Sequence, residues 1–313
     1  MSWYGYVLIM VLVLILLFVA IVGYIGAYRL FHPAHGDLEY TRRREQERSP
    51  GLMDIYDNWN VKKYTIKSRH GYDLAVYQVK PELESNRFVV LAHGYGYTHH
   101  GVVKYAKMML ALGFNVVMFD ERFHGQSGGT FCSMGYYEKD DVYDLVSAII
   151  ERYGNDIIIG TYGESMGGAA VILEQAIDKR IHFVITDCTF FDLTELMLYQ
   201  VKKTIGLMPQ PFVFFTNLFF KIRTGVWLKD ISPIKNVVEP NCPMLFVHGE
   251  EDEVIPPEHS KKLYESCKGK KAIYIAGNHA RHTDSARYNE DEYLIKLRSF
   301  FKETVCLPDR SII

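Results

Sequence analysis

Hydrophobic and polar positions follow three successive patterns along this 313-residue chain. An uncharged apolar run, WYGYVLIMVLVLILLFVAIVGYIGAY, occupies residues 3–28, and a polar stretch with the charge run RRREQER follows it. Beyond that stretch, short apolar runs of strand length alternate with segments of helical period. The pattern predicts a transmembrane anchor over 1–28, a juxtamembrane linker over 29–60 and one folded domain over 61–313.

The first apolar run is long enough to cross a bilayer. A helix over residues 3–28 would measure roughly 39 Å, whereas the hydrocarbon core is about 30 Å thick. Its ends carry Trp3 and Tyr28, which are typical of membrane interfaces. A cleaved signal peptide is the alternative, but it would begin with basic residues, and the first charge here is Arg29. We therefore expect a retained, single-pass anchor in the cell membrane.

Basic residues follow the apolar run and none precedes it. They are Arg29, Arg42, Arg43, Arg44 and Arg48. The positive-inside rule therefore predicts that the folded domain lies on the cytoplasmic side. A surface helix on anionic lipid is an alternative interpretation of the charged segment.

The pattern after residue 60 is typical of an α/β fold. Residues 62–68 and 73–79 alternate around a turn and predict an opening hairpin. Further strands are expected at 87–94, 115–120, 156–163, 181–188, 243–249 and 271–277. Helices are expected at 102–113, 138–154, 165–177, 257–267 and 290–305. Buried strands that alternate with helices predict a mostly parallel sheet with helices on both faces.

One segment interrupts this alternation. Residues 190–232 contain FVFF, LFF and VWL, and are too apolar for a solvated loop of that length. We interpret the segment as a small helical lid over one end of the sheet. A core-packing excursion is the alternative, and contact with the bilayer is a further use of the same apolar surface.

Composition narrows the function. The net charge of −2 gives no electrostatic basis for nucleic-acid binding. The five cysteines show neither metal-ligand spacing nor a framework of pairs. His93, His99 and His100 lie close together but lack fixed ligand spacing. We therefore expect no metal and no cofactor.

The stretch Gly163-Glu164-Ser165-Met166-Gly167 matches G-x-S-x-G, between a predicted strand and a predicted helix. A strand-to-helix turn this tight strains the serine backbone, and the glycines let neighbouring elements approach. Ser165 is therefore predicted to project its hydroxyl from the carboxyl edge of the sheet as a nucleophile.

A serine nucleophile needs a base that a third group orients. In this motif's fold the acid follows the serine and the histidine comes last. The strand end LFVHGEEDEVIPP supplies Asp252, which is our predicted acid, at the turn before VIPP. Glu250, Glu251 and Glu253 are its alternatives.

The next strand end, IYIAGNHARH, supplies two histidines at the same edge of the sheet. His279 is the predicted base because it follows the strand end directly. His282 is the alternative, and we expect it to be a surface or supporting residue.

Acyl transfer also needs hydrogen-bond donors for the oxyanion. One should be the N–H of Met166, after the nucleophile, and the other the N–H of Tyr95 in the loop LAHGYGYTHHG. Four residues are expected to support the site from neighbouring loops: His93, Gly94, Arg122 and His124.

Taken together, the sequence resembles the α/β-hydrolase superfamily, and specifically membrane-anchored bacterial serine hydrolases of the lipase/esterase-like or prolyl-oligopeptidase-like type. The matching stretches are LAHGYGYTHHG, FDERFHGQSGG, GTYGESMGGAA, DISPIKNVVEPNCPMLFVHGEEDEVIPP and YIAGNHARH. The resemblance implies the triad Ser165, Asp252 and His279, with Tyr95 and Met166 as oxyanion donors. The chain departs from the peptidase branch in lacking an N-terminal propeller-like domain. Dehalogenases and epoxide hydrolases of this fold carry an aspartate where this chain has Ser165.

The expected activity is hydrolysis of carboxylic esters with apolar acyl or aryl groups. A peptidase, amidase or thioesterase on the same triad is the first alternative, and a non-catalytic, membrane-tethered binding protein is the second. The expected partners are a small-molecule or lipid-like ester and, through the N-terminal helix, membrane lipid. The pattern does not indicate an oligomeric state.

Overall fold

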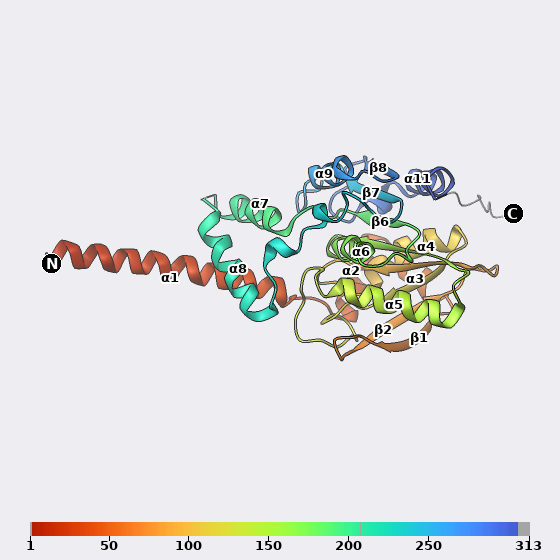
Figure 1. Ribbon diagram of the computed structural model, residues 1–313, viewed down its shortest axis with the longest axis horizontal. Coiled ribbons are helices and arrows are strands. Elements are labelled where there is room, and N and C mark those ends of the chain that lie inside the picture. The colour runs from red at the N-terminus through yellow and green to blue at the C-terminus, as the bar shows by residue number, and fades with distance from the viewer. Residues whose placement is uncertain (1, 207, 306–313) are drawn as a thin grey trace.

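A long N-terminal helix projects from a domain built on a single twisted sheet (Figure 1). The computed structural model describes residues 2–206 and 208–305. The predicted domain range of 61–313 therefore ends in residues that lie outside the described part, as does position 207 of the predicted lid.

The sheet has eight strands in the order β1-β2-β4-β3-β5-β6-β7-β8. They are β1 (Lys62–Lys67), β2 (Asp73–Val79), β3 (Arg87–Ala92), β4 (Asn115–Phe119), β5 (Ile158–Glu164), β6 (Val184–Asp187), β7 (Met244–Gly249) and β8 (Lys271–Ala276). β1 and β2 form the predicted hairpin, and β2 also pairs antiparallel with β4. All the other pairs are parallel, which confirms the mostly parallel sheet.

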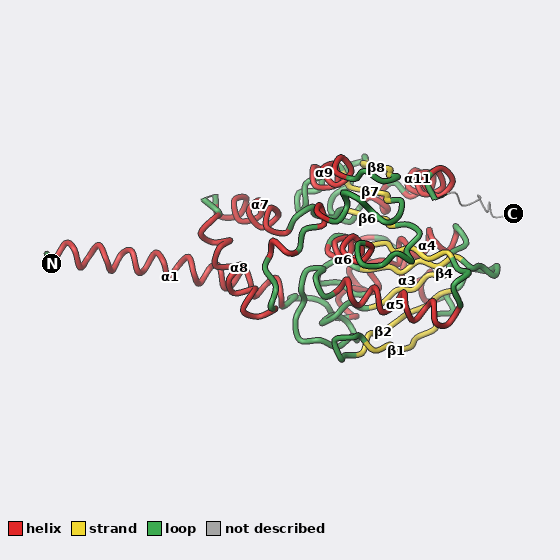
Figure 2. The backbone as a smooth tube through the Cα atoms, in the orientation of Figure 1, coloured by secondary structure: helices red, strands yellow, loops and turns green. Residues whose placement is uncertain are grey.

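Helices cover both faces of the sheet, as the pattern predicted (Figure 2). The α-helices are α1 (Trp3–Phe31), α2 (Leu38–Arg48), α3 (Leu52–Asp57), α4 (Val103–Ala111), α5 (Glu138–Tyr153), α6 (Met166–Gln175), α7 (Leu193–Ile205), α8 (Gln210–Thr224), α9 (Glu258–Ser266), α10 (Ser285–Tyr288) and α11 (Glu290–Glu303). One core cluster joins the sheet to α3, α4 and α11, and a second joins its other face to α5, α6 and α9. The parallel strands are buried on both sides, which explains their continuous apolar centres.

Residues 29–60 are not the polar linker that the sequence predicted. α1 continues to Phe31, and α2 and α3 then fold against the domain. Thr41 and Glu45 of α2 are fully buried, and the Glu45 carboxylate pairs with the Arg287 guanidinium at 2.5 Å. α2 buries polar groups through specific partners, so it lacks the apolar stripe by which a packed helix is recognised in a sequence.

Residues 190–232 contain α7 and α8 and lie between β6 and β7. α8 packs along the C-terminal half of α1 (Figure 1). A Cβ atom at Gly23 would lie only 2.4 Å from the Cβ of Phe215, so the glycine permits this close approach. The Thr216 hydroxyl donates to the Gly23 carbonyl at 3.2 Å. The first helix and the inserted segment therefore form one packing unit.

α1 is long and apolar enough to cross a membrane, and only 11% of its most apolar window is buried in the protein. The C-terminal turns of α1 do contact protein. Ala27 and Phe31 belong to a third hydrophobic cluster, which also includes Met166 and side chains of α7 and α8.

The burial of α2 leads to a stability prediction. Glu45→Ala leaves the buried Arg287 guanidinium with only its longer, 3.4 Å ion pair to Asp284, and the loss should lower the free energy of unfolding by about 3–5 kcal/mol. Thermal unfolding of the full chain in detergent measures the effect. The control is Glu47→Ala on the same helix, whose partner Arg44 is solvent-exposed, so the loss should be about 0–1 kcal/mol. Equal losses for both variants would contradict the packed role of α2.

Candidate active site

Ser165 lies in the sharp turn between β5 and α6. Its φ of 54° is in the left-handed region, and its N–H donates to the Asp187 carbonyl at 2.8 Å. A Cβ atom at Gly163 would lie 2.2 Å from the Gly167 carbonyl oxygen, and one at Gly167 would lie 2.4 Å from the Ala92 carbonyl oxygen. Both glycines are therefore required by close backbone approach, and the turn holds Ser165 in a strained conformation.

His282 lies between Ser165 and Asp252. Its Nε2 is 3.1 Å from the Ser165 Oγ, and its Nδ1 is 2.7 Å from the Asp252 Oδ2. A carboxylate only accepts hydrogen bonds, so Nδ1 carries the proton and Nε2 is free to accept from the serine hydroxyl. This tautomer is the one that a general base for Ser165 requires.

Asp252 is held by four hydrogen-bond donors. Its Oδ1 accepts from the N–H groups of Val254 and Ile255, at 2.8 and 2.9 Å. Its Oδ2 lies 3.1 Å from the Nε2 of His248 as well as near His282. Burial by itself would raise the pKa of Asp252, but the hydrogen bonds from His248 and His282 outweigh burial and hold the pKa well below its usual range. The carboxylate therefore stays charged and fixed beside the imidazole.

His279, the predicted base, is not near Ser165. Its side chain is 85% exposed and pairs with Glu251, with Nδ1 2.5 Å from Oε1. The hydrogen bond that His279 donates to the Glu251 carboxylate raises the pKa of His279. The prediction that His279 is the base for Ser165 is therefore wrong. His282, which we expected to be a surface or supporting residue, lies between Asp252 and Ser165 instead.

The path of the loop after β8 explains this correction. Asn278 and His279 both have positive φ, at 56° and 58°, and this turn directs the His279 ring into solvent. Ala280 then becomes fully buried, and its carbonyl accepts from the N–H of Glu251 at 3.0 Å. The chain thereby reaches Asp252 only at position 282. The second histidine in NHARH was the one signal for this in the sequence.

Both predicted oxyanion donors lie in elements beside Ser165. Met166 begins α6, where the N–H groups of the first turn have no intrahelical acceptor. A Cβ atom at Gly94 would lie 3.5 Å from the Ser165 Cβ, so the loop that continues into Tyr95 runs against the nucleophile. The Tyr95 hydroxyl donates to the Arg29 carbonyl, which ties this loop to the end of α1.

His93 and His124 support that loop. His93 donates from Nδ1 to the Gly94 carbonyl at 2.8 Å, and its Nε2 accepts from the Glu121 N–H at 2.9 Å. The Nε2 of His124 accepts from the Gly96 N–H at 3.1 Å. Burial lowers the pKa of both histidines, that of His93 to about 3, so both stay neutral acceptors at neutral pH.

Arg122 lies over aromatic rings. Its guanidinium carbon is 4.5 Å from the ring centre of Phe131 and 4.9 Å from that of Tyr137. These contacts are cation–π interactions in a buried setting. The arginine thus organises the loop after β4.

A buried ion pair lies behind Ser165, and no sequence pattern indicated it. The carboxylate of Glu164 pairs with the Lys104 ammonium at 2.5 Å, and both side chains are at least 94% buried. The Tyr105 hydroxyl donates to Glu164 at 2.8 Å and lies 3.1 Å from Asp187. These polar groups fix the residue before Ser165 from beneath, so the position x in G-x-S-x-G has a structural role here.

The site has a poor donor set for a metal. Donor atoms of Cys188, Asp252 and His282 all lie within 4.8 Å of one another. Burial and nearby carboxylates raise the pKa of the Cys188 thiol well above its usual value, so it stays protonated. Nδ1 of His282 is already committed to Asp252.

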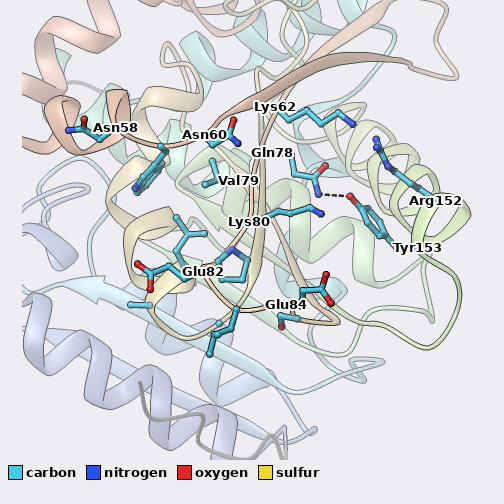
Figure 3. Close-up of a pocket in the computed structure, with 17 residues that line it drawn as sticks. Asn58, Asn60, Lys62, Gln78, Val79, Lys80, Glu82, Glu84, Arg152 and Tyr153 are labelled. Carbon is cyan, nitrogen blue, oxygen red and sulfur yellow. Dashed lines mark hydrogen bonds between the residues drawn. The ribbon is translucent and has the colours of Figure 1, made fainter. Parts of the chain in front are cut away.

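A separate hollow of about 1560 Å³ lies at the opposite edge of the sheet (Figure 3). Its walls come from the ends of β1 and β2, the loop 80–85 and the C-terminal ends of α4 and α5. Figure 3 shows the Gln78 amide pointing toward the Tyr153 hydroxyl, at 3.0 Å. No predicted site residue lines this hollow, so it is separate from the Ser165 site.

This chain is similar to one family model and to several known proteins. A family model described as "Serine aminopeptidase, S33" matches residues 84–213. The uncharacterized protein YqkD of Bacillus subtilis is 32% identical over 260 residues, which cover 82% of this chain and 85% of YqkD. The mouse protein named lysophosphatidylserine lipase ABHD12 is 29% identical over 207 residues, which cover 63% of this chain and 49% of that protein.

Solved structures share the fold. The Pyrococcus furiosus esterase Pf2001 superposes with a TM-score of 0.65 at 22% identity, covering 81% of this chain and 94% of the esterase. At that identity the likeness concerns the fold.

The two histidines can be separated by experiment. His282→Ala removes the imidazole that contacts Ser165, and reaction with a fluorophosphonate probe should fall by a factor on the order of 10⁴. His279→Ala, the matched control three residues earlier, should react as the unmodified chain does, because its side chain faces solvent. The measurement is the rate of probe incorporation by the full chain. Loss of labelling in His279→Ala with labelling retained in His282→Ala would overturn the assignment.

Proposed function

This chain belongs to the α/β-hydrolase superfamily, and on that premise we propose that it is a membrane-anchored serine hydrolase that cleaves carboxylic esters. The observation that carries the proposal is the contact series from the Ser165 Oγ to the His282 Nε2 and from the His282 Nδ1 to Asp252. This combination supplies a nucleophile, a base and an orienting acid.

The reaction proceeds through an acyl-enzyme. His282 takes the proton of Ser165 as the hydroxyl attacks the ester carbonyl, and then delivers it to the leaving alcohol. Asp252 keeps the imidazole in the productive tautomer and stabilises the imidazolium. The N–H groups of Met166 and Tyr95 donate to the oxyanion, aided by the positive end of the α6 dipole. Water, activated by His282, then releases the acid.

The apolar surroundings of the site support an apolar acyl or aryl group. The third hydrophobic cluster contains Met166 and extends through α7 and α8 to Ala27 and Phe31 of α1. Tyr95 packs against the same cluster. An acyl chain bound beside Ser165 would therefore meet hydrophobic side chains on several elements. The lipase name of one relative agrees with such a substrate.

Amide hydrolysis is the second candidate, because the matching family model carries an aminopeptidase description. The same triad and oxyanion donors would serve it, and a thioester would be attacked in the same way. Substrate choice then depends on the leaving-group side of the site.

The exposed apolar surface of α1 supports a membrane anchor. The basic residues that follow it, from Arg29 to Arg48, support a cytoplasmic position for the domain.

Substrate class can be tested with p-nitrophenyl esters of increasing acyl length and with peptide amides. We expect kcat/KM to rise by up to roughly fourfold per added methylene while the chain stays within the apolar cluster. Ser165→Ala should abolish turnover and fluorophosphonate labelling. Faster cleavage of amides than of every ester would favour the peptidase alternative. An unmodified chain that neither labels nor turns over would favour a non-catalytic binding protein.

Sidedness has its own test in a bacterial host. Green fluorescent protein fused after residue 313 should fluoresce, because it folds in the cytoplasm. Alkaline phosphatase at the same position should be inactive, because it needs the oxidising side of the membrane. The reverse pattern would place the domain outside.

A further inference from the structure

The loop that carries His282 has a strained backbone. Thr283 has a φ of 66°, which is unfavourable for a β-branched residue. The turn is closed by the Asp284 N–H, which donates to the Arg281 carbonyl at 3.0 Å. A conformation of this kind persists only where surrounding groups hold it. The position of the His282 ring therefore depends on contacts outside the loop.

One arginine from the segment between the membrane helix and the sheet supplies such contacts. The Nη2 of Arg48, the last residue of α2, lies 3.1 Å from the His282 carbonyl oxygen, 2.9 Å from the Thr283 hydroxyl and 2.6 Å from the Asp284 carboxylate. Arg48 thus contacts three consecutive residues of the loop. Its side chain is 23% exposed and that of Asp284 is 10% exposed, so solvent screens the pair only in part.

Arg48 also contacts the loop that carries the predicted oxyanion donor. Its Nη1 is 3.4 Å from the Tyr97 hydroxyl, and the Tyr97 N–H donates to the Gly94 carbonyl at 3.2 Å. The guanidinium therefore bridges the two loops that flank Ser165. A planar group with several fixed donors suits this task, whereas an ammonium cannot reach acceptors on both sides at once.

Neighbouring contacts keep α2 in place. Glu45 and Ser49 both accept hydrogen bonds from Arg287, each at 2.5 Å or slightly more. From the sheet side, the Ser285 hydroxyl donates to Asp187 at 2.9 Å. The loop of His282 is thus held between the end of β6 and α2.

We propose that Arg48 is a positioning residue, which holds the main chain of residues 282–284 so that the His282 imidazole meets Ser165. The inference rests on the proposed serine hydrolase function. In this proposal α2 contributes to the site through Arg48. The segment that follows the membrane helix thereby determines the position of His282. Small displacements matter because a shift of about 1 Å in a catalytic group can lower the rate roughly 100-fold.

The experiment uses the full chain in detergent with the best p-nitrophenyl ester. Arg48→Met keeps the length of the side chain but removes its donors and charge, and we expect kcat to fall about 10- to 100-fold while KM stays within about threefold. Arg48→Lys should lie between Arg48→Met and the unmodified chain, which is partial rescue by the conservative variant. The matched control is Arg42→Met on the same helix, which pairs with the exposed Asp57 and not with the loop residues, and it should retain the full kcat.

Thermal unfolding separates positioning from general stability. A purely structural role would lower the melting temperature of Arg48→Met while the kcat of the folded fraction stayed at the level of Arg42→Met, and that result would overturn the proposal. If Arg48→Met does not fold, Arg48→Lys and Thr283→Val carry the test, and an unchanged kcat in both would overturn it. Ser165→Ala and His282→Ala distinguish a failure of the proposed function from a failure of the role of Arg48. If the unmodified chain is inactive, the proposed function fails. If both of these variants are inactive and Arg48→Met is as active as Arg42→Met, only the role of Arg48 fails.

Discussion

The close approach of three backbones at Ser165 is the constraint on which the rest of the site depends. β5 ends, α6 begins and the end of β3 passes alongside, with so little space that side chains at Gly163 and Gly167 would collide with main-chain atoms. The strained φ of Ser165 follows from this crowding. The buried Glu164–Lys104 pair holds the residue before Ser165 in place.

The partners of Ser165 come from separate strand ends, and each is fixed by groups of its own. Asp252 is held by main-chain donors of its own loop and by His248, near the end of β7. His282 lies on a strained loop that Asp187 supports from the sheet and α2 supports from outside. Asp252 is thus positioned locally, whereas the loop of His282 is also contacted by a helix more than 230 residues earlier in the chain.

The end of α1, the inserted helices α7 and α8 and the α/β domain share one hydrophobic cluster. Gly23 lets α8 lie against α1, and the cluster continues from Ala27 and Phe31 to Met166, next to the nucleophile. Movement of α8 relative to α1 would therefore change the apolar surroundings of Ser165. The first helix and the inserted helices therefore form one unit with the apolar side chains next to Ser165.

The sequence by itself determined the order of strands and helices, the mostly parallel sheet, the turn at Ser165 and the place of Asp252 after β7. These features depend on local periodicity and on residues that are adjacent in the chain. Only the tertiary structure decided between His279 and His282, because both follow the same strand and only the left-handed turn at Asn278 and His279 determines which ring reaches Asp252. It also decided that residues 38–57 belong to the domain, since α2 is held by buried polar pairs with residues far along the chain, and such pairs leave no periodic signal.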